Sequence, residues 1–188
     1  MPVRYEALWL ASLRVHVTSA LVTFPLCLAL MTRWLQRRAT WHRWIGRVTA
    51  TLMLFALVPS GIVLAFDAKG GAPVTAGFLL SAAIVAYFVV RGTLHARRRD
   101  LVSHRRAMRH VVAQMSVAVT SRAMLFGLDA LGADPDTSYV AALWLPVLLS
   151  AAVVESAPII ERIRREYSAL ALPMRVRAFL RPDARLGR

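Results

Sequence analysis

Two short motifs hold the residues of this sequence that are best suited to chemistry. Residues 42–47 read H-R-W-I-G-R and residues 104–109 read H-R-R-A-M-R, so both follow the pattern H-R-x-x-x-R. Histidine binds haem iron or exchanges a proton near neutral pH, and arginine binds carboxylates and phosphates through a planar set of N–H donors. The motifs therefore predict a site for a cofactor or an anionic ligand.

The spacing within each motif places its arginines on one face of a helix, because residues four positions apart are neighbours on a helical surface. Arg47 and Arg109 end the two motifs, and Gly46 lies one turn after His42. A glycine at this position leaves room for a flat ring beside His42. We expect His42 and His104 to lie at similar depth on two neighbouring helices.

Long apolar segments on both sides of the motifs predict helices that cross a membrane. Residues 48–66 and residues 72–90 contain no Asp, Glu, Lys or Arg. Each is long enough to cross about 30 Å of hydrocarbon as a helix. Three further segments contain one histidine or charged side chain each: His16 in 15–32, Arg122 in 111–128 and Glu155 in 139–160.

These segments predict an all-α fold, a polytopic membrane bundle of five transmembrane helices. The expected spans are, approximately, 15–34, 46–66, 72–92, 107–130 and 139–160. An outer N-terminal arm at 1–14 precedes them, and a basic cytoplasmic tail at 161–188 follows them. Because the motif opens both the second and the fourth span, the sequence suggests two helical hairpins in parallel repetition plus one helix.

The charges of the chain are divided unevenly between the two ends of the spans. The sequence is 57% hydrophobic and has a formal net charge of +14 at pH 7, a combination that excludes a disordered basic tail or a DNA-packing protein. Arginines gather in residues 33–47, in residues 91–109 and after residue 160, whereas the opposite connections are acidic. By the positive-inside rule, we expect the N-terminus outside and the C-terminus in the cytoplasm.

The arginines lie directly beside the spans, which favours anionic lipid headgroups at the cytoplasmic face, and not nucleic acid, as their partners. Trp34, Trp41 and Trp44 are expected to anchor the same face in the headgroup region. The single cysteine, Cys27, excludes an intramolecular disulfide. No small-residue cleavage site follows residues 15–31, so we expect the N-terminal segment to remain in the mature protein.

Two ionisable residues are expected in the outer half of the membrane. At 1.5 Å per residue, His16 lies roughly 24 Å from the cytoplasmic end of its span and Arg122 roughly 20 Å from the start of its own. An arginine at this depth should face the bundle interior and find acceptors there. His16, Ser60 and carbonyl groups near Pro59 are the expected acceptors, because a proline leaves a carbonyl one turn earlier without its helical donor.

A second polar layer is expected at the cytoplasmic side. Glu155 is predicted to be buried near the end of the fifth span and to need a cation, which Arg47 or Arg109 can supply. The same layer contains His42 and His104. Between the two layers the sequence predicts an apolar middle.

Together these residues resemble a bacterial family of integral membrane proteins, the domain of unknown function 2306. The resemblance rests on residues 42–47, residues 104–109, His16, Arg122 and Glu155, and covers roughly residues 12–160. The sequence departs from the family at Ala107, where an aromatic residue is usual. The resemblance implies a multi-pass protein of the bacterial inner membrane, and it implies no particular activity.

Two functions fit these features. In the first, a b-type haem or a quinone lies between helices, with His42 and His104 as metal ligands only if the metal is haem iron, and with Arg47 and Arg109 near the propionates. In the second, an auxiliary subunit of a membrane complex binds anionic lipid or isoprenoid phosphate through its arginines. A third interpretation gives the arginines a purely topological role and the histidines a structural one.

The sequence contains no H-E-x-x-H, Walker or G-x-S-x-G motif and no pair of carboxylates within the spans. We therefore expect no catalytic residues and favour a protein that is not an enzyme. A homo-oligomer or a larger membrane complex is compatible with the sequence.

Overall fold

The computed structural model describes residues 6–171. The start of the predicted N-terminal arm and residues 172–188 of the predicted basic tail lie outside the described residues. The chain divides into two compact units, residues 1–154 and residues 155–188. The first unit contains both H-R-x-x-x-R motifs.

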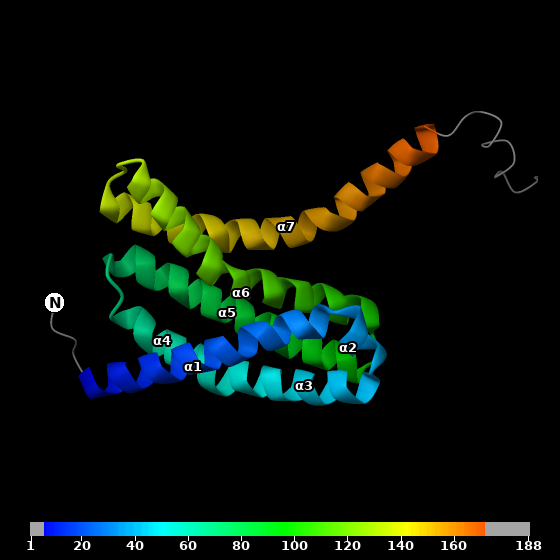
Figure 1. Cartoon of the computed structure of the whole chain (residues 1–188), viewed down its shortest axis with the longest axis horizontal. Coiled ribbons are helices and arrows are strands. Elements are labelled where there is room, and N and C mark those ends of the chain that lie inside the picture. The colour runs from blue at the N-terminus through cyan, green and yellow to red at the C-terminus, as the bar shows by residue number, and fades with distance from the viewer. Residues whose placement is uncertain (1–5, 172–188) are drawn as a thin grey trace, which may run out of the picture. The chain divides into compact units, whose positions relative to one another are not determined.

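Every regular element in the described part of the chain is a helix (Figure 1). In chain order the elements are α1 (Glu6–Met31), α2 (Arg33–Arg37), α3 (Ala39–Leu52), the π-helical turn η1 (Met53–Leu57), α4 (Val58–Phe66), α5 (Gly71–Arg97), α6 (Leu101–Ala130) and α7 (Pro135–Ala171). Five segments are long and apolar enough to cross a membrane: α1, the continuous segment Ala39–Phe66, α5, α6 and residues Pro135–Ser156 of α7. The predicted all-helical fold with five spans is confirmed.

Most helices extend beyond the predicted spans because hydrogen bonds, and not hydropathy, determine where a helix ends, although α1 ends at Met31, before the predicted end of the first span at residue 34. α1 begins at Glu6, so most of the predicted N-terminal arm belongs to the first helix. α6 begins at Leu101, where the Asp100 side chain accepts a hydrogen bond of 3.0 Å from the Ser103 N–H. In the same way, Asp134 accepts a 2.9 Å bond from the Thr137 N–H at the start of α7.

The second span changes its helical pitch in the middle. Pro59 has no N–H, so a regular helix would leave a carbonyl one turn earlier without a donor. The π-helical turn η1 lies directly before this proline, and at its end the Val58 N–H donates to the Met53 carbonyl. The chain thereby passes the proline as one continuous helical segment from Ala39 to Phe66.

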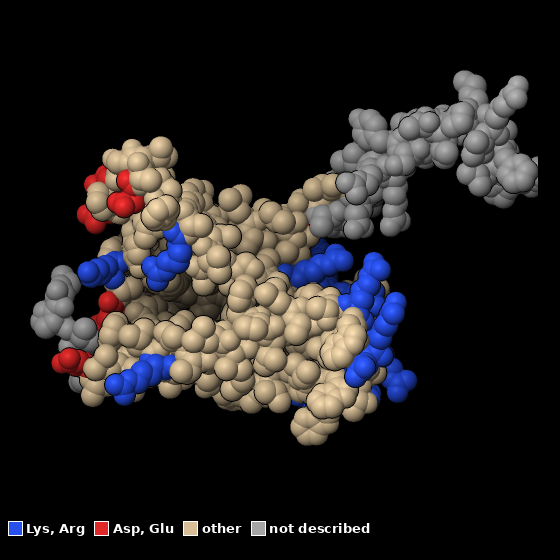
Figure 2. Space-filling model, viewed as in Figure 1, with Lys and Arg blue, Asp and Glu red and all other residues tan. Residues whose placement is uncertain are grey.

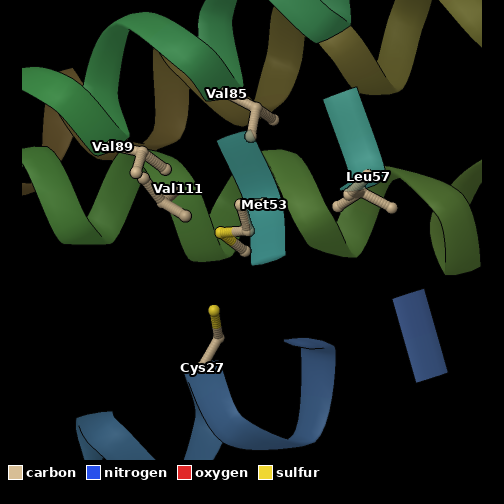
Figure 3. Packing of buried hydrophobic residues seen from close by; sticks show 6 residues of the cluster. All are labelled: Cys27, Met53, Leu57, Val85, Val89 and Val111. Atoms are coloured by element: carbon tan, nitrogen blue, oxygen red, sulfur yellow. The ribbon is translucent and has the colours of Figure 1, made fainter. Parts of the chain in front are cut away.

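Two apolar clusters hold the first unit together. One joins α1, η1, α5 and α6 and consists of Cys27, Met53, Leu57, Val85, Val89 and Val111. Figure 3 shows Cys27 pointing from α1 toward Met53 of the π-helical turn. The other cluster joins α5, α6 and α7 and consists of Val74, Val117, Leu143 and Val147. The many van der Waals contacts between these buried side chains hold the spans against one another.

The predicted apolar middle is not wholly apolar. Gln114 of α6 is buried, and its amide N–H donates to the Ser81 hydroxyl of α5 at 2.8 Å. The Ser150 hydroxyl of α7 donates to the carbonyl oxygen of the same side chain at 2.8 Å. The amide is tolerated inside the bundle because both of its ends are hydrogen-bonded. One side chain thus links three spans.

The two ends of the first unit differ in charge (Figure 2). We call the end that contains α2 and the α5–α6 link the basic end, because the arginines of residues 33–47 and 91–109 gather there. At the opposite end, the α4–α5 and α6–α7 links carry most of the aspartates together with one lysine: Asp67, Lys69, Asp129, Asp134 and Asp136. Trp34, Trp41 and Trp44 are all more than 60% exposed at the basic end.

A candidate histidine site at the basic end

The structure brings the two H-R-x-x-x-R motifs together. His42 lies in the first turn of α3 and His104 in the first turn of α6. Their ring centres are 6.5 Å apart and their ring planes are nearly perpendicular, at 84°. Two histidines that are distant in the sequence therefore form a pair inside the basic end.

A backbone carbonyl fixes the orientation of His104. Its Nδ1 lies 2.8 Å from the Gly92 carbonyl oxygen of α5. A carbonyl oxygen can only accept, so Nδ1 carries the hydrogen and the Nε2 of the neutral ring keeps a free lone pair. A hydrogen bond of this kind is typical of metal-ligating histidines, because it holds the ring and makes the ligand nitrogen more basic.

Small residues allow the carbonyl to come this close. Gly92 is buried, and a Cβ at this position would collide with the end of the Met108 side chain and lie 3.2 Å from the Ala107 Cβ. The absence of a large side chain at both positions lets α5 and α6 approach. A side chain as small as that of Ala107 fits against Gly92 at this contact.

His42 has a different environment. Its Nδ1 is buried and has no hydrogen-bond partner in the described part of the chain. A buried polar nitrogen without a partner costs free energy, and in native proteins it commonly marks a place where a ligand, ion or water binds. One turn further along α3, a Cβ on Gly46 would find only the Leu30 side chain, at 4.0 Å. The predicted room beside His42 is therefore compatible with the structure.

The two arginines that end the motifs are exposed. Neither Arg47 nor Arg109 forms an ion pair or a hydrogen bond within the described residues. Both guanidinium groups are therefore able to reach anionic groups outside the chain, such as lipid phosphates or the carboxylates of a bound cofactor.

His16 lies near the middle of α1, in the half away from the basic end, and is also held by backbone. Its Nδ1 is 3.2 Å from the Leu57 carbonyl and 3.3 Å from the Ser60 hydroxyl oxygen. The acceptors that the sequence suggested for Arg122 thus contact His16. His16 was predicted to be a buried polar residue, and in the structure its ring is half-buried.

Arg122 and Glu155 are exposed, so the prediction that they are buried is wrong. Depth along a helix follows from residue number, but the direction of a side chain depends on its position around the helix. Val117 belongs to the inward stripe of α6, and Arg122 is about 140° around the helix from it, at 100° per residue. Glu155 follows the buried Val154 and points away from that side of α7. Its predicted pairing with an arginine stays a prediction.

Two other histidines have structural surroundings. His110 is buried, and its ring stacks on Phe88 of α5 with ring centres 4.0 Å apart. His95 contacts the Asp100 carboxylate at 3.1 Å at the basic end. The pKa of Asp100 is lowered, first by its hydrogen bonds from Ser103 and then by His95.

The fold and the charge distribution define a multi-pass helical membrane protein with a histidine pair at one end. The chain belongs to the family described as predicted membrane protein (DUF2306), whose model matches residues 13–157. The resemblance inferred from the motifs is thereby confirmed. No curated protein and no solved structure matches the chain.

Proposed function

We propose that the protein binds one b-type haem between α3 and α6, with His42 and His104 as its axial ligands. The observation that carries this proposal is the distance of 6.5 Å between the two ring centres. A metal ion bound at about 2.0–2.1 Å by one nitrogen of each of two imidazoles separates the ring centres by roughly 6 Å. The observed separation of the two rings is therefore compatible with a shared iron and supports the proposal.

The ligand set favours a metal that brings its own equatorial ligands. Within the described residues, no group of three or more His, Cys, Asp or Glu side chains is placed to hold a metal ion. A porphyrin supplies four nitrogens, so haem iron needs only two imidazoles from the protein. When bound, haem would supply one-electron transfer.

The surroundings of the pair fit this ligand. The Gly92 carbonyl holds the His104 ring through Nδ1, which leaves Nε2 for iron. A bound ligand would also give a partner to the buried His42 Nδ1, and Gly46 leaves space on the same face of α3. Arg47 and Arg109 would bind the propionates. A quinone fits the pair less well, because His104 Nε2 has no hydrogen to donate to a quinone carbonyl.

An absorption spectrum tests the proposal. The protein, expressed with haem supplied and purified in detergent, should show a Soret band and reduced α and β bands typical of bis-histidine haem, at one haem per chain. Substitution of either His42 or His104 by Ala should abolish the low-spin spectrum. The matched control His95→Ala should leave it unchanged. Absence of a Soret band in the wild type, or an unchanged spectrum in both variants, would contradict the proposal.

A second candidate function is the binding of anionic lipid at the basic end. The Arg38 guanidinium lies over the Trp34 ring at 4.4 Å, beside the exposed Trp41 and Trp44. Indoles favour the headgroup region, and arginines bind phosphate there. Native mass spectrometry should then detect anionic phospholipid on the wild type and less of it on an Arg47→Gln, Arg109→Gln double variant.

A further inference from the structure

His16 is held in one tautomer inside the first unit, far along α1 from the basic end. The Leu57 carbonyl can only accept a hydrogen bond, and it lies 3.2 Å from His16 Nδ1. The Ser60 hydroxyl is 2.6 Å from the Ala56 carbonyl, so its hydrogen is directed there and its oxygen faces His16 as an acceptor. Nδ1 therefore carries the hydrogen, and Nε2 of the neutral ring presents a lone pair.

The second span is shaped to receive this ring. A Cβ on Gly61 would lie 3.1 Å from His16 Cε1 and 3.3 Å from His16 Nδ1, closer than such contacts usually allow. The glycine thus lets the imidazole lie directly against the α4 backbone. The π-helical turn η1 supplies Leu57, and π turns of this kind occur often at functional sites.

The other nitrogen of the ring has no partner of its own. No hydrogen bond joins His16 Nε2 to another residue in the part of the chain that the structure describes, and the ring is only half-buried. Ser12 and Ser19, which share the face of α1 with His16, are buried, and the apolar residues on either side of it, Val15 and Val17, are 45% and 46% exposed. His16 therefore offers a neutral hydrogen-bond acceptor in an apolar setting that lipid-soluble molecules can reach.

We propose that His16 Nε2 accepts a hydrogen bond from the hydroxyl group of a lipid-soluble quinol. A neutral lone pair requires a donor, which a quinol has and the corresponding quinone lacks. The phenolic hydroxyl is a stronger donor than an aliphatic alcohol, and an alkyl-substituted ring is compatible with apolar surroundings. The site therefore prefers the reduced form over the oxidised form. This inference does not depend on haem at the His42–His104 pair.

Binding to the full chain in lipid nanodiscs tests this preference. The probes are a decyl-substituted benzoquinol, kept reduced under anaerobic conditions, its quinone, its dimethyl ether and decanol. Partition into nanodiscs that contain the protein is compared with partition into empty ones. The quinol should bind about tenfold more tightly than each of the other three probes, as expected for one hydrogen bond of this type.

Two substitutions locate the site. His16→Phe removes the acceptor and should lower quinol affinity about tenfold, to that of the dimethyl ether. Gly61→Ala keeps the imidazole but pushes it off the α4 backbone, and should also weaken quinol binding. The control His95→Phe replaces a histidine at the basic end and should leave binding unchanged. Circular dichroism verifies that each variant is folded.

Two results would overturn the proposal: equal binding of the quinol and its dimethyl ether by the wild type, or full quinol affinity in a folded His16→Phe variant. If His16→Phe does not fold, the comparison of the four probes on the wild type still tests whether the protein prefers the quinol. Failure here is separate from failure of the haem proposal, because the haem spectrum depends on His42 and His104 and is recorded without any quinol.

Discussion

His16 and His104 are oriented by the same structural device. In both, Nδ1 donates to a backbone carbonyl of a neighbouring span, at 3.2 Å and 2.8 Å, and a glycine on that span allows the close approach. For His16 the glycine is Gly61, and for His104 it is Gly92, whose own carbonyl accepts the bond. A fixed tautomer prepares the opposite nitrogen for a ligand before the ligand arrives.

Replacement of Gly92 by Leu should separate α5 from α6. The new side chain would collide with Met108 and press on Ala107, and overpacking of this kind costs about 1–3 kcal/mol of the free energy of unfolding. Unfolding in mixed detergent micelles measures the loss. Gly127→Leu is the matched control on α6, because a Cβ there meets nothing within 4 Å. An equal loss in both variants would show that the close contact at Gly92 does not stabilise the protein.

Only part of the candidate site could be predicted from the sequence, because the sequence indicates the depth of a residue in a span but not its contacts. His42 and His104 stand at the same position in two similar motifs, so their equal depth was predictable, and the structure brings them together. The hydrogen bond from His104 to the Gly92 carbonyl was not predictable, because the residue type at position 92 does not indicate which histidine its backbone carbonyl contacts. The exposure of Arg122 was missed because depth does not determine which face of a helix a residue occupies.

At the scale of the elements, hydropathy predicted where the chain crosses the membrane but not where each helix begins and ends. A run of apolar residues indicates where a helix crosses the hydrocarbon, but the helix continues into water as long as its terminal N–H groups find acceptors. Asp100 and Asp134 supply these acceptors at the starts of α6 and α7. No sequence pattern predicted the π-helical turn η1 either, although Pro59 indicated that the second span would not keep a regular hydrogen-bond pattern.

The cap at Asp100 predicts a dependence of stability on acid. Hydrogen bonds from Ser103, and then His95, hold the pKa of this carboxyl below its unfolded value. Its stabilising effect is therefore complete above the unfolded pKa of about 3.9 and is lost as the pH falls through the lower, folded pKa. The thermal midpoint of the wild type should exceed that of Asp100→Ala at neutral pH, and the difference should shrink below about pH 4.

The comparison needs two further variants of the same kind. Asp100→Asn keeps a capping side chain without the charge, so it should lie between the wild type and Asp100→Ala and should not show the acid-dependent part of the difference. Asp129→Asn removes a carboxylate near the C-terminal end of α6, where it caps no helix start. A constant difference between the wild type and Asp100→Ala from neutral pH to pH 3 would refute the contribution of the ionised cap.

At the scale of the whole first unit, most of the arginines lie at one end. The basic end carries exposed arginines together with three exposed tryptophans, and the opposite end carries aspartates at its links. In the positive-inside rule, arginines beside short connections retain those connections on the cytoplasmic side. The rule therefore predicts an orientation with α2 and the α5–α6 link inside and the α6–α7 link outside.

Cysteine labelling in intact cells tests this orientation. Cys27 is only 5% exposed and should not react with a membrane-impermeant maleimide. Its replacement by Ser ensures that any labelling comes from an introduced cysteine. In that background, Leu131→Cys places a thiol at a position that is 83% exposed on the α6–α7 link, and it should be labelled from outside. Ala96→Cys, at the exposed end of α5 beside the basic link, should be labelled only after the cells are permeabilised. The opposite pattern would place the basic end outside and remove the topological explanation of the arginines, whereas labelling of both positions in intact cells would indicate a chain inserted in two orientations.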